Sequence, residues 1–494
     1  MTALTYEKIV PSQAGPGVPV FANGRAMYSL RNPQRDADAF AGALGDSPSG
    51  FAVVFGLGTG LHIEALLKKR PGLKVLAVEA SADNIAFLRP FLVRGIEGAV
   101  LCPAEDLYRV FLSSYVPLLD GNVTVLFQQA WKNAHPEVCL RGEAVLAKAL
   151  EAAKNDVATQ AHFGKLWHRN ILLNIRAMEA AGEGGRLCLP RDREALVAAA
   201  GPTLEDAIGP LAQNRENTFV IAADTAYLAL LRKGITPDAV VTIDGQGVSV
   251  NHFMRGIRGV LFADLCANPA VPRLFYGAGR PVVFFRNGHP LGELAASYAK
   301  ERGAPEEFLP LISAGAGTVT ASAWGAARRG GFSTITLAGA DFSFPRNRPY
   351  AGGVYLEDSF FPCARRTAPA ETAFTGLMFR GATCPSPEGG TLTTPLLLSF
   401  RRSLEKLTAS PPEALDFFST QGGFLGGFIS WYKNHLEEAL ASGVFQGRGD
   451  PLVSSCLPLL AWARGQKSLF GQKQDIFSAL KLAQTAAARY TIPQ

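Results

Sequence analysis

Short apolar runs and amphipathic stretches alternate along the N-terminal part of the chain. The run at 51–55 is followed by glycines at 56, 58 and 60 and then by a helical pattern, and a second apolar run ends at Glu79. A strand, a glycine-rich turn, a helix and a second strand are the start of a βαβ unit. With a further apolar run at 122–128, the pattern predicts an α/β domain over residues 1–150.

Residues 151–185 are predicted to connect this domain to the next. Ala, Leu and Lys recur at helical spacing without proline over 143–182, and glycines follow at 182, 184 and 185. The spacing predicts one or two connecting helices that end at this glycine-rich break.

The central part of the chain, residues 186–400, predicts a Rossmann-like domain. Its candidate strands are 195–200, 219–224, 239–244, 259–264, 281–285, 309–313 and 334–339. Because helical stretches separate several of them, we expect a mostly parallel sheet with helices on both faces. Residues 346–400 have weak periodicity and predict a long excursion with some strand, whereas 401–494 return to helical spacing and predict a helical C-terminal region. The fold class expected is multidomain α/β.

The composition of the chain restricts which functions are possible. The 494 residues are enough for about three domains, and a net charge of +6 spread along the chain fits anionic small molecules better than nucleic acid. The seven cysteines are widely spaced without a C-x-x-C pair, so neither a zinc site nor a disulfide framework is expected. We expect no metal, no signal peptide, no membrane span and a cytoplasmic location.

Candidate chemistry lies where predicted strands end, because open α/β sheets bind ligands beyond the carboxyl ends of their strands. The first such turn contains Gly201, Pro202 and Thr203, which allow a close backbone approach and offer a hydroxyl. A capped strand-to-helix turn is the alternative interpretation.

Two neighbouring predicted strands end in Asp224, which Thr225 follows, and Asp244. Two strand-end carboxylates suit a ribose, a sugar hydroxyl or a divalent cation. The alternatives are a helix N-cap for Asp224 and a turn with Gly245 for Asp244.

A glycine-rich turn leads from a predicted strand into a helix and contains Ser313, Gly315, Gly317 and Thr318. Free N–H groups and a helix N-terminus coincide there, which favours an anion. The turn lacks the G-K-[ST] ending of a P-loop. The small residues that follow it have an alternative role in close packing against the sheet.

A fourth strand-end segment contains Asp341 and then Arg346, Arg348 and Tyr350. Two arginines and a tyrosine are suited to position phosphate or carboxylate oxygens. The alternative is a solvated basic loop.

The N-terminal glycines at 56, 58 and 60, with Glu79 about 20 residues on, look like the entry to an S-adenosylmethionine methyltransferase fold, with Glu79 as the ribose-binding acid. No catalytic motif follows them, so whether this turn binds a ligand stays open. The histidines are scattered, and we interpret His289 as a helix-start residue rather than as a cleft residue.

Four segments together resemble the motility-associated factor family of bacterial flagellin glycosyltransferases: G-P-T-L-E-D-A-I at 201–208, residues 220–245, residues 313–344 and the R-x-R-x-Y-A pattern at 346–351. That family transfers nonulosonic acids, such as pseudaminic or legionaminic acid, from a CMP-linked donor to flagellin Ser or Thr. The central domain also resembles archaeal 6-hydroxymethylpterin diphosphokinases and bacterial sialyltransferases. The resemblance covers about residues 190–350, and the three-part layout extends it across nearly the whole chain.

The resemblance implies roles for particular residues. Gly201, Pro202, Thr203 and Leu204 match the G-P-S-L motif, with Thr in place of Ser, and Ser313, Gly315 and Thr318 match a turn near the donor phosphate. Asp224, Asp244 and Asp341 match strand-end acids. The sequence-based assignment takes Asp244 and Asp341 as catalytic. It takes as donor-binding Gly201, Pro202, Thr203, Asp224, Thr225, Ser313, Gly315, Gly317, Thr318, Arg346, Arg348 and Tyr350. The histidine base of sialyltransferases has no match, which leaves the base open.

The function expected is therefore a glycosyltransferase that modifies flagellin from a CMP-activated donor and supports flagellum assembly and motility, with no firmly implied cofactor. Two alternatives stay open. One is a pyrophosphokinase that uses ATP and Mg²⁺, with Asp244 or Asp341 as metal ligands. The other is a non-catalytic flagellin-binding protein.

Overall fold

The computed structural model describes residues 5–13, 15–45, 49–182, 184–312, 317–409, 411–419, 422–443, 449–466 and 475–491. The chain divides into two compact units, Met1–His162 and Phe163–Gln494. The helix α7 (Pro136–Ala181) begins in the first and ends in the second. The predicted α/β class, with parallel sheets and C-terminal helices, is confirmed.

The first unit contains a four-stranded parallel sheet with strand order β5-β4-β3-β6. Every residue of β3 is buried, as expected for an inner strand of a parallel sheet. The three predicted strands are observed as β3, β4 and β6. Besides α7, the strands and α-helices of this unit are β1 (Tyr6–Val10), β2 (Val18–Phe21), α1 (Pro33–Gly42), β3 (Phe51–Phe55), α2 (Leu61–Lys69), β4 (Lys74–Glu79), α3 (Ala82–Leu88), β5 (Val100–Pro103), α4 (Leu107–Ser114), α5 (Pro117–Asp120), β6 (Val123–Phe127) and α6 (Gln129–Ala134).

The second unit is built on a six-stranded parallel sheet with strand order β12-β11-β10-β9-β8-β13. Six of the seven strands expected in this region are present. The strands and the helices between them are β8 (Glu194–Ala198), α8 (Leu204–Gln213), β9 (Thr218–Ala223), α9 (Asp224–Arg232), β10 (Ala239–Thr242), η5 (Gly247–Phe253), β11 (Val260–Asp264), α10 (Ala270–Gly277), β12 (Val282–Phe285), α11 (Pro290–Glu301), α12 (Val319–Arg329) and β13 (Ile335–Ala338).

The strand predicted at 309–313 is wrong for the residues that the structure describes there. Leu311 makes only an isolated parallel bridge to Arg286. Leu309 has φ +49°, outside the β region, and Pro310 has no N–H to give to a ladder. Ser313 lies outside the described residues.

One face of the six-stranded sheet packs against α12. Val197, Ile221 and Val241 from three strands join Ala323 and Ala326 of the helix in one buried cluster. Small side chains let the helix approach the sheet closely, so the small residues after the glycine-rich turn do pack as their alternative interpretation expected.

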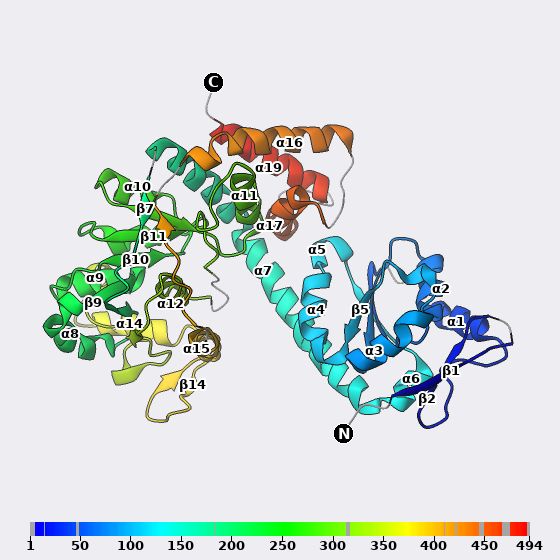
Figure 1. Cartoon of the computed structure of the whole chain (residues 1–494). Coiled ribbons are helices and arrows are strands. Elements are labelled where there is room, and N and C mark those ends of the chain that lie inside the picture. The colour runs from blue at the N-terminus through cyan, green and yellow to red at the C-terminus, as the bar shows by residue number, and fades with distance from the viewer. Residues whose placement is uncertain are drawn as a thin grey trace. The chain divides into compact units, whose positions relative to one another are not determined.

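The rest of the second unit consists of short strand pairs and helices. Among the described residues, α16 and α17 pack on α19, and α17 also packs on α11 (Figure 1). No described helix combines the length and the apolar character needed to cross a bilayer. The remaining strands and α-helices of this unit are β7 (Arg186–Leu187), α13 (Leu356–Phe360), α14 (Ala370–Met378), β14 (Cys384–Pro385), β15 (Leu392–Thr393), α15 (Pro395–Thr408), β16 (Phe417–Phe418), α16 (Phe428–Ser442), α17 (Pro451–Gly465) and α19 (Ile476–Tyr490).

Candidate active site

The strand order of the second sheet creates a crevice beside β8. From β8 the chain adds strands on one side as far as β12, and β13 then pairs with the opposite side of β8. The connections that leave β8 and β13 therefore diverge, and open α/β sheets bind ligands at such a switch point. A cavity of about 650 Å³ lies there, with walls that include residues 199–201 after β8 and 339–341 after β13. We call it the switch-point cavity.

Part of the predicted site lines this cavity and part does not. The lining includes Gly201, Thr225, Thr318, Asp341 and Tyr350. The residues outside the lining are Pro202, Thr203, Asp224, Asp244, Gly317, Arg346 and Arg348. Ser313 and Gly315 lie outside the described residues.

Asp341 joins the two sides of the cavity. The backbone N–H of Thr203 donates to Asp341 Oδ2 at 3.0 Å, and the Thr203 hydroxyl donates to Oδ1. Gly201 lies so close that a Cβ there would overlap the Asp341 carboxylate and the carbonyl oxygen of Gly339. The glycine of the G-P-T-L turn is therefore required by the approach of the loop after β13.

Thr318 caps α12 at the cavity wall. Its hydroxyl accepts from the N–H of Ala321 at 3.2 Å, and residues 318–320 line the cavity. Gly317 has φ +65°, a conformation that favours glycine. The first turn of an 11-residue helix thus points its partial positive charge toward this wall.

The two arginines predicted to bind an anion are engaged by acids of α8. Arg346 lies 2.6 Å from Asp206 Oδ1, and Arg348 lies 2.7 Å from Glu205 Oε2. The hydrogen bond from Arg348 holds the pKa of Glu205 below its usual range. In this structure both arginines anchor residues 345–350 to α8 rather than line the cavity.

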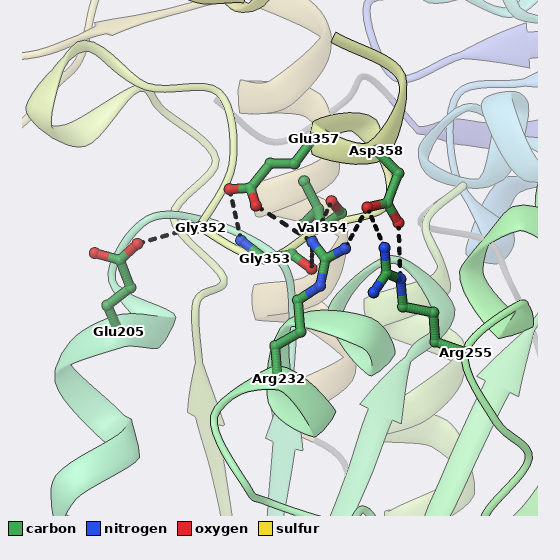
Figure 2. A network of polar contacts seen from close by, with 8 residues as sticks. All are labelled: Glu205, Arg232, Arg255, Gly352, Gly353, Val354, Glu357 and Asp358. Carbon is green, nitrogen blue, oxygen red and sulfur yellow. Dashed lines mark hydrogen bonds and ion pairs between the residues drawn. The ribbon is translucent and has the colours of Figure 1, made fainter. Parts of the chain in front are cut away.

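Further contacts continue this anchoring to α13 (Figure 2). Arg232 of α9 donates to the carbonyl oxygen of Gly353 at 3.0 Å and pairs with Glu357 at 3.2 Å and Asp358 at 2.5 Å. Arg255 also pairs with Asp358, at 2.9 Å. These contacts fix the segment that carries Tyr350 and Tyr355.

Arg380 is a residue that the sequence did not single out. It lies after α14, is exposed, and has no hydrogen bond or ion pair with another described residue. Among the described residues that line the switch-point cavity, it is the only cation and Asp341 the only anion. Burial raises the pKa of Tyr350, and the charge of Arg380 opposes that rise. Arg380 is therefore available to an anionic ligand.

The ends of β9 and β10 bring a second polar group together. Asp224 is 2% exposed, and its carboxylate accepts from the N–H of Thr225 at 2.7 Å and from the hydroxyl of Thr242 at 2.8 Å. Burial raises the pKa of Asp224. Asp244 is half-buried and accepts from the N–H of Gln246 at 2.9 Å. Asp224 thus connects the start of α9 to the end of β10, and Asp244 holds its own turn.

His252 lies next to these acids and was also missed. It is buried, its Nδ1 has no hydrogen-bond partner in the described structure, and its ring packs edge-on against Tyr355 at 4.6 Å. Burial lowers the pKa of His252, while Asp224 and Asp244 act in the opposite direction. Their charges also act on Tyr355, so the four side chains form one cluster.

His289 behaves as the sequence predicted. It is the N-cap of α11, and its Nδ1 accepts from the N–H of Leu291 at 3.2 Å.

The N-terminal glycine-rich turn is packed by side chains of its own unit. Buried Glu79 accepts from the N–H groups of Leu57 at 3.1 Å and Ala80 at 2.8 Å, and from Trp131 Nε1 at 2.7 Å. A Cβ on Gly58 would lie 2.5 Å from the sulfur of Met27. The carboxylate expected to hold a ribose is therefore satisfied by the protein itself.

Several known proteins are similar to this chain. Residues 169–347 match the family described as 6-hydroxymethylpterin diphosphokinase MptE-like. An uncharacterized protein of Treponema pallidum (strain Nichols) is 30% identical over 232 residues, which cover 46% of this chain and 75% of the relative. A second uncharacterized protein of that strain is 33% identical over 144 residues, covering 28% of this chain and 67% of the relative.

A solved structure is similar over almost the whole length. The MAf glycosyltransferase from Magnetospirillum magneticum AMB-1 matches 99% of this chain and 86% of its own, with 14% identity and a TM-score of 0.55. At that identity the similarity establishes a shared fold.

Proposed function

The chain belongs to the same family as its Treponema pallidum relatives, and from the cavity that its MptE-like region helps to build we propose that it is a glycosyltransferase with a nucleotide-activated donor. The observation that carries the proposal is the switch-point cavity itself, which combines Arg380 and the start of α12 with Asp341 on one wall. A cation and a helix N-terminus favour a phosphate, and a nearby carboxylate suits proton transfer. The fold shared with the MAf glycosyltransferase supports the same assignment.

We further propose that the donor is a CMP-linked nonulosonic acid and the acceptor a Ser or Thr of flagellin, so that the reaction supports flagellum assembly and motility. The G-P-T-L turn and the loop after β13, which carry the motif resemblance, meet at this cavity. The reaction is assigned to the cytoplasm, which the free state of all seven cysteines supports.

In this reaction the bond between the anomeric carbon and the phosphate oxygen breaks, and CMP leaves with the electron pair. The acceptor oxygen bonds to the same carbon, and its proton moves to a base. We assign the base to Asp341, and Arg380 to the charge that develops on the leaving phosphate. Asp244, outside the lining, acts through its charge on Tyr355 and His252.

The match to a diphosphokinase family supports a second candidate, a pyrophosphokinase that uses ATP and Mg²⁺. It would recruit Asp244 or Asp341 as a metal ligand. Among the described residues no group of three potential ligands is preassembled, so such a site would have to include oxygens of the nucleotide.

Calorimetric titration of the full-length protein with CMP, with ATP plus Mg²⁺ and with S-adenosylmethionine separates these candidates. We expect CMP to bind without Mg²⁺. Flagellin incubated with protein and CMP-linked donor should then gain the mass of one or more sugar residues. Binding of ATP that requires Mg²⁺, without binding of CMP, would instead support the pyrophosphokinase. Flagellin binding with no nucleotide binding and no mass change would support a non-catalytic role.

A further inference from the structure

A second cavity lies against the first. It has a volume of about 500 Å³ and is lined by Leu337 of β13, by the β14–β15 turn and by Arg401 and Leu404 of α15. Residues 340–343 line both this cavity and the switch-point cavity, so Asp341 is part of both walls. We call the second one the edge cavity.

The edge cavity adjoins an open side of the six-stranded sheet. Among the described strands, β13 is the last one of that sheet and pairs with β8 alone. Because Ala195 N donates to Thr334 O and Ala199 N donates to Ala338 O, the backbone groups of Ile335 and Leu337 point away from β8. No described strand pairs with that side, and the Leu337 side chain is 38% exposed. An open edge of this kind is a template for another extended segment.

The loop between the two cavities is held in a strained form. Phe342 has φ +47°, which a side-chain-bearing residue adopts at a cost. The Thr393 hydroxyl donates to the carbonyl oxygen of Phe342 at 2.6 Å, and Phe344 N–H donates to Leu392 O at 2.8 Å. The β15 strand thus keeps the loop, with Asp341, between the cavities.

The charges of the edge cavity differ from those of the switch-point cavity. Arg401, the one arginine among the described residues of its lining, already pairs with Glu388 and with Glu405, the latter at 3.0 Å. With Asp341 the lining carries more acids than bases, and no described cation there is free. Such a wall disfavours a second phosphate and accepts a neutral or basic partner.

We propose that the edge cavity is the acceptor subsite and that its occupant is an extended polypeptide segment, which pairs with the outer side of β13 and presents a Ser or Thr hydroxyl to Asp341. The inference rests on the proposed glycosyltransferase function. The polypeptide pairs by main-chain hydrogen bonds to Ile335 and Leu337, its side chains contact Leu337 and Leu404, and the Asp341 carboxylate receives the hydroxyl proton as the donor's phosphate leaves from the other cavity.

The test compares Leu337→Pro with Leu337→Ala in the full-length protein. The proline removes the outward N–H but no hydrogen bond to β8, whereas alanine keeps that N–H and shortens the side chain. Three quantities are measured for each: CMP affinity, hydrolysis of a CMP-linked donor in water, and sugar transfer to flagellin. Hydrogen exchange of the β13 amides in the wild type, with and without flagellin, reports pairing without requiring turnover.

We expect Leu337→Pro to lower transfer to flagellin at least tenfold while CMP affinity and donor hydrolysis stay within twofold of wild type, and Leu337→Ala to have a smaller effect on transfer. Flagellin should slow hydrogen exchange at the amides of Ile335 and Leu337.

Transfer at the wild-type rate by folded Leu337→Pro, or unchanged hydrogen exchange, would overturn the acceptor subsite without contradicting the donor site. Transfer to small hydroxyl compounds by the wild type at the rate of transfer to flagellin would overturn the polypeptide subsite and point to a small acceptor instead. If the wild type neither binds CMP nor hydrolyses the CMP-linked donor, the proposed function is contradicted. Protection of the β13 amides from exchange by flagellin would in that case still identify β13 as the docking edge. If Leu337→Pro fails to fold, Leu337→Lys replaces it: lysine keeps the outward N–H, but a charged side chain on an edge strand disfavours pairing with another strand, so transfer to flagellin should again fall below that of Leu337→Ala.

Discussion

Thr203 and Asp341 lie 138 residues apart in sequence, yet the backbone N–H of Thr203 donates to Asp341 Oδ2 at 3.0 Å. The Thr203 hydroxyl donates to the other carboxylate oxygen. Because Thr203 follows β8 and Asp341 follows β13, the two contacts tie together the diverging connections at the switch point. Hydrogen bonds to an ionised carboxylate are stronger than neutral ones, so this pair fixes both the loops and the orientation of the carboxylate.

Asp341→Asn should impair stability and catalysis together. Loss of the charge-assisted contacts should lower the free energy of unfolding by about 1.5–3 kcal/mol. Loss of the proposed base should lower sugar transfer by roughly a hundredfold or more. Urea unfolding and transfer assays measure the two effects. Asp206→Asn is the matched control, because Asp206 is an exposed acid of α8 that pairs with Arg346, and it should leave transfer unchanged. Sugar transfer by Asp341→Asn at the wild-type rate would show that Asp341 is not the base.

Arg380→Gln should weaken CMP binding without unfolding the protein. The side chain is exposed and has no described partner, so its loss leaves no buried group unsatisfied. A lost ionic contact to phosphate should reduce affinity about ten- to hundredfold. Calorimetry measures the affinity, and a melting curve checks the fold. Arg346→Gln serves as the comparison, because Arg346 pairs with Asp206 and lies outside the cavity lining. A larger loss of affinity in Arg346→Gln than in Arg380→Gln would reverse the assignment.

The strands were predictable because parallel strands covered on both faces are continuous apolar runs. All residues of β9 are buried, and its run ends where the prediction placed it, at the start of α9 with Asp224. The prediction failed at 309–313, where an apolar run contains a proline and a residue with positive φ. Apolar character alone does not distinguish such a segment from a strand.

The position of the cavity could not be predicted, since it depends on β13 returning to pair with β8 across more than a hundred residues of chain. The search for polar and glycine residues just after predicted strands identified Gly201 and Asp341, which line the cavity, because they lie in the turns that follow β8 and β13. Arg380 and His252 follow no strand end, and their significance comes only from tertiary contacts. Arg346 and Arg348 resembled anion ligands in sequence because their partners on α8 were not visible there.

Gly201→Ala and Gly209→Ala should differ in their effect on stability. A Cβ on Gly201 would overlap the Asp341 carboxylate, whereas one on Gly209, inside α8, would have no atom within 4 Å. Gly201→Ala should therefore lower the free energy of unfolding by about 1–3 kcal/mol and weaken CMP binding. Gly209→Ala should change it by roughly 0.5 kcal/mol or less, because the helix propensity of alanine is offset by the ring of Pro210, which disfavours a Cβ on the preceding helical residue, and it should leave binding unchanged. Urea unfolding and calorimetry on both variants test this, and equal stability of the two would show that the loop after β13 moves away at little cost.

His168 of α7 should make the second unit sensitive to acid. It is 1% exposed, neither ring nitrogen has a partner in the described structure, and burial lowers its pKa to about 3. An unfolded histidine titrates near pH 6.5, so between that pH and about 3 the unfolded chain binds a proton that the folded one does not. The contribution of neutral His168 to the free energy of unfolding is therefore fully present above pH 6.5 and is lost progressively as the pH falls. At pH 5 the free energy of unfolding should be lower than at pH 8 by about 2 kcal/mol because of this residue.

His168→Leu should remove that part of the pH dependence in urea unfolding, whereas His435→Gln, at an exposed position of α16, should retain it. The same pH dependence in His168→Leu as in the wild type would show that folding does not shift the pKa of His168.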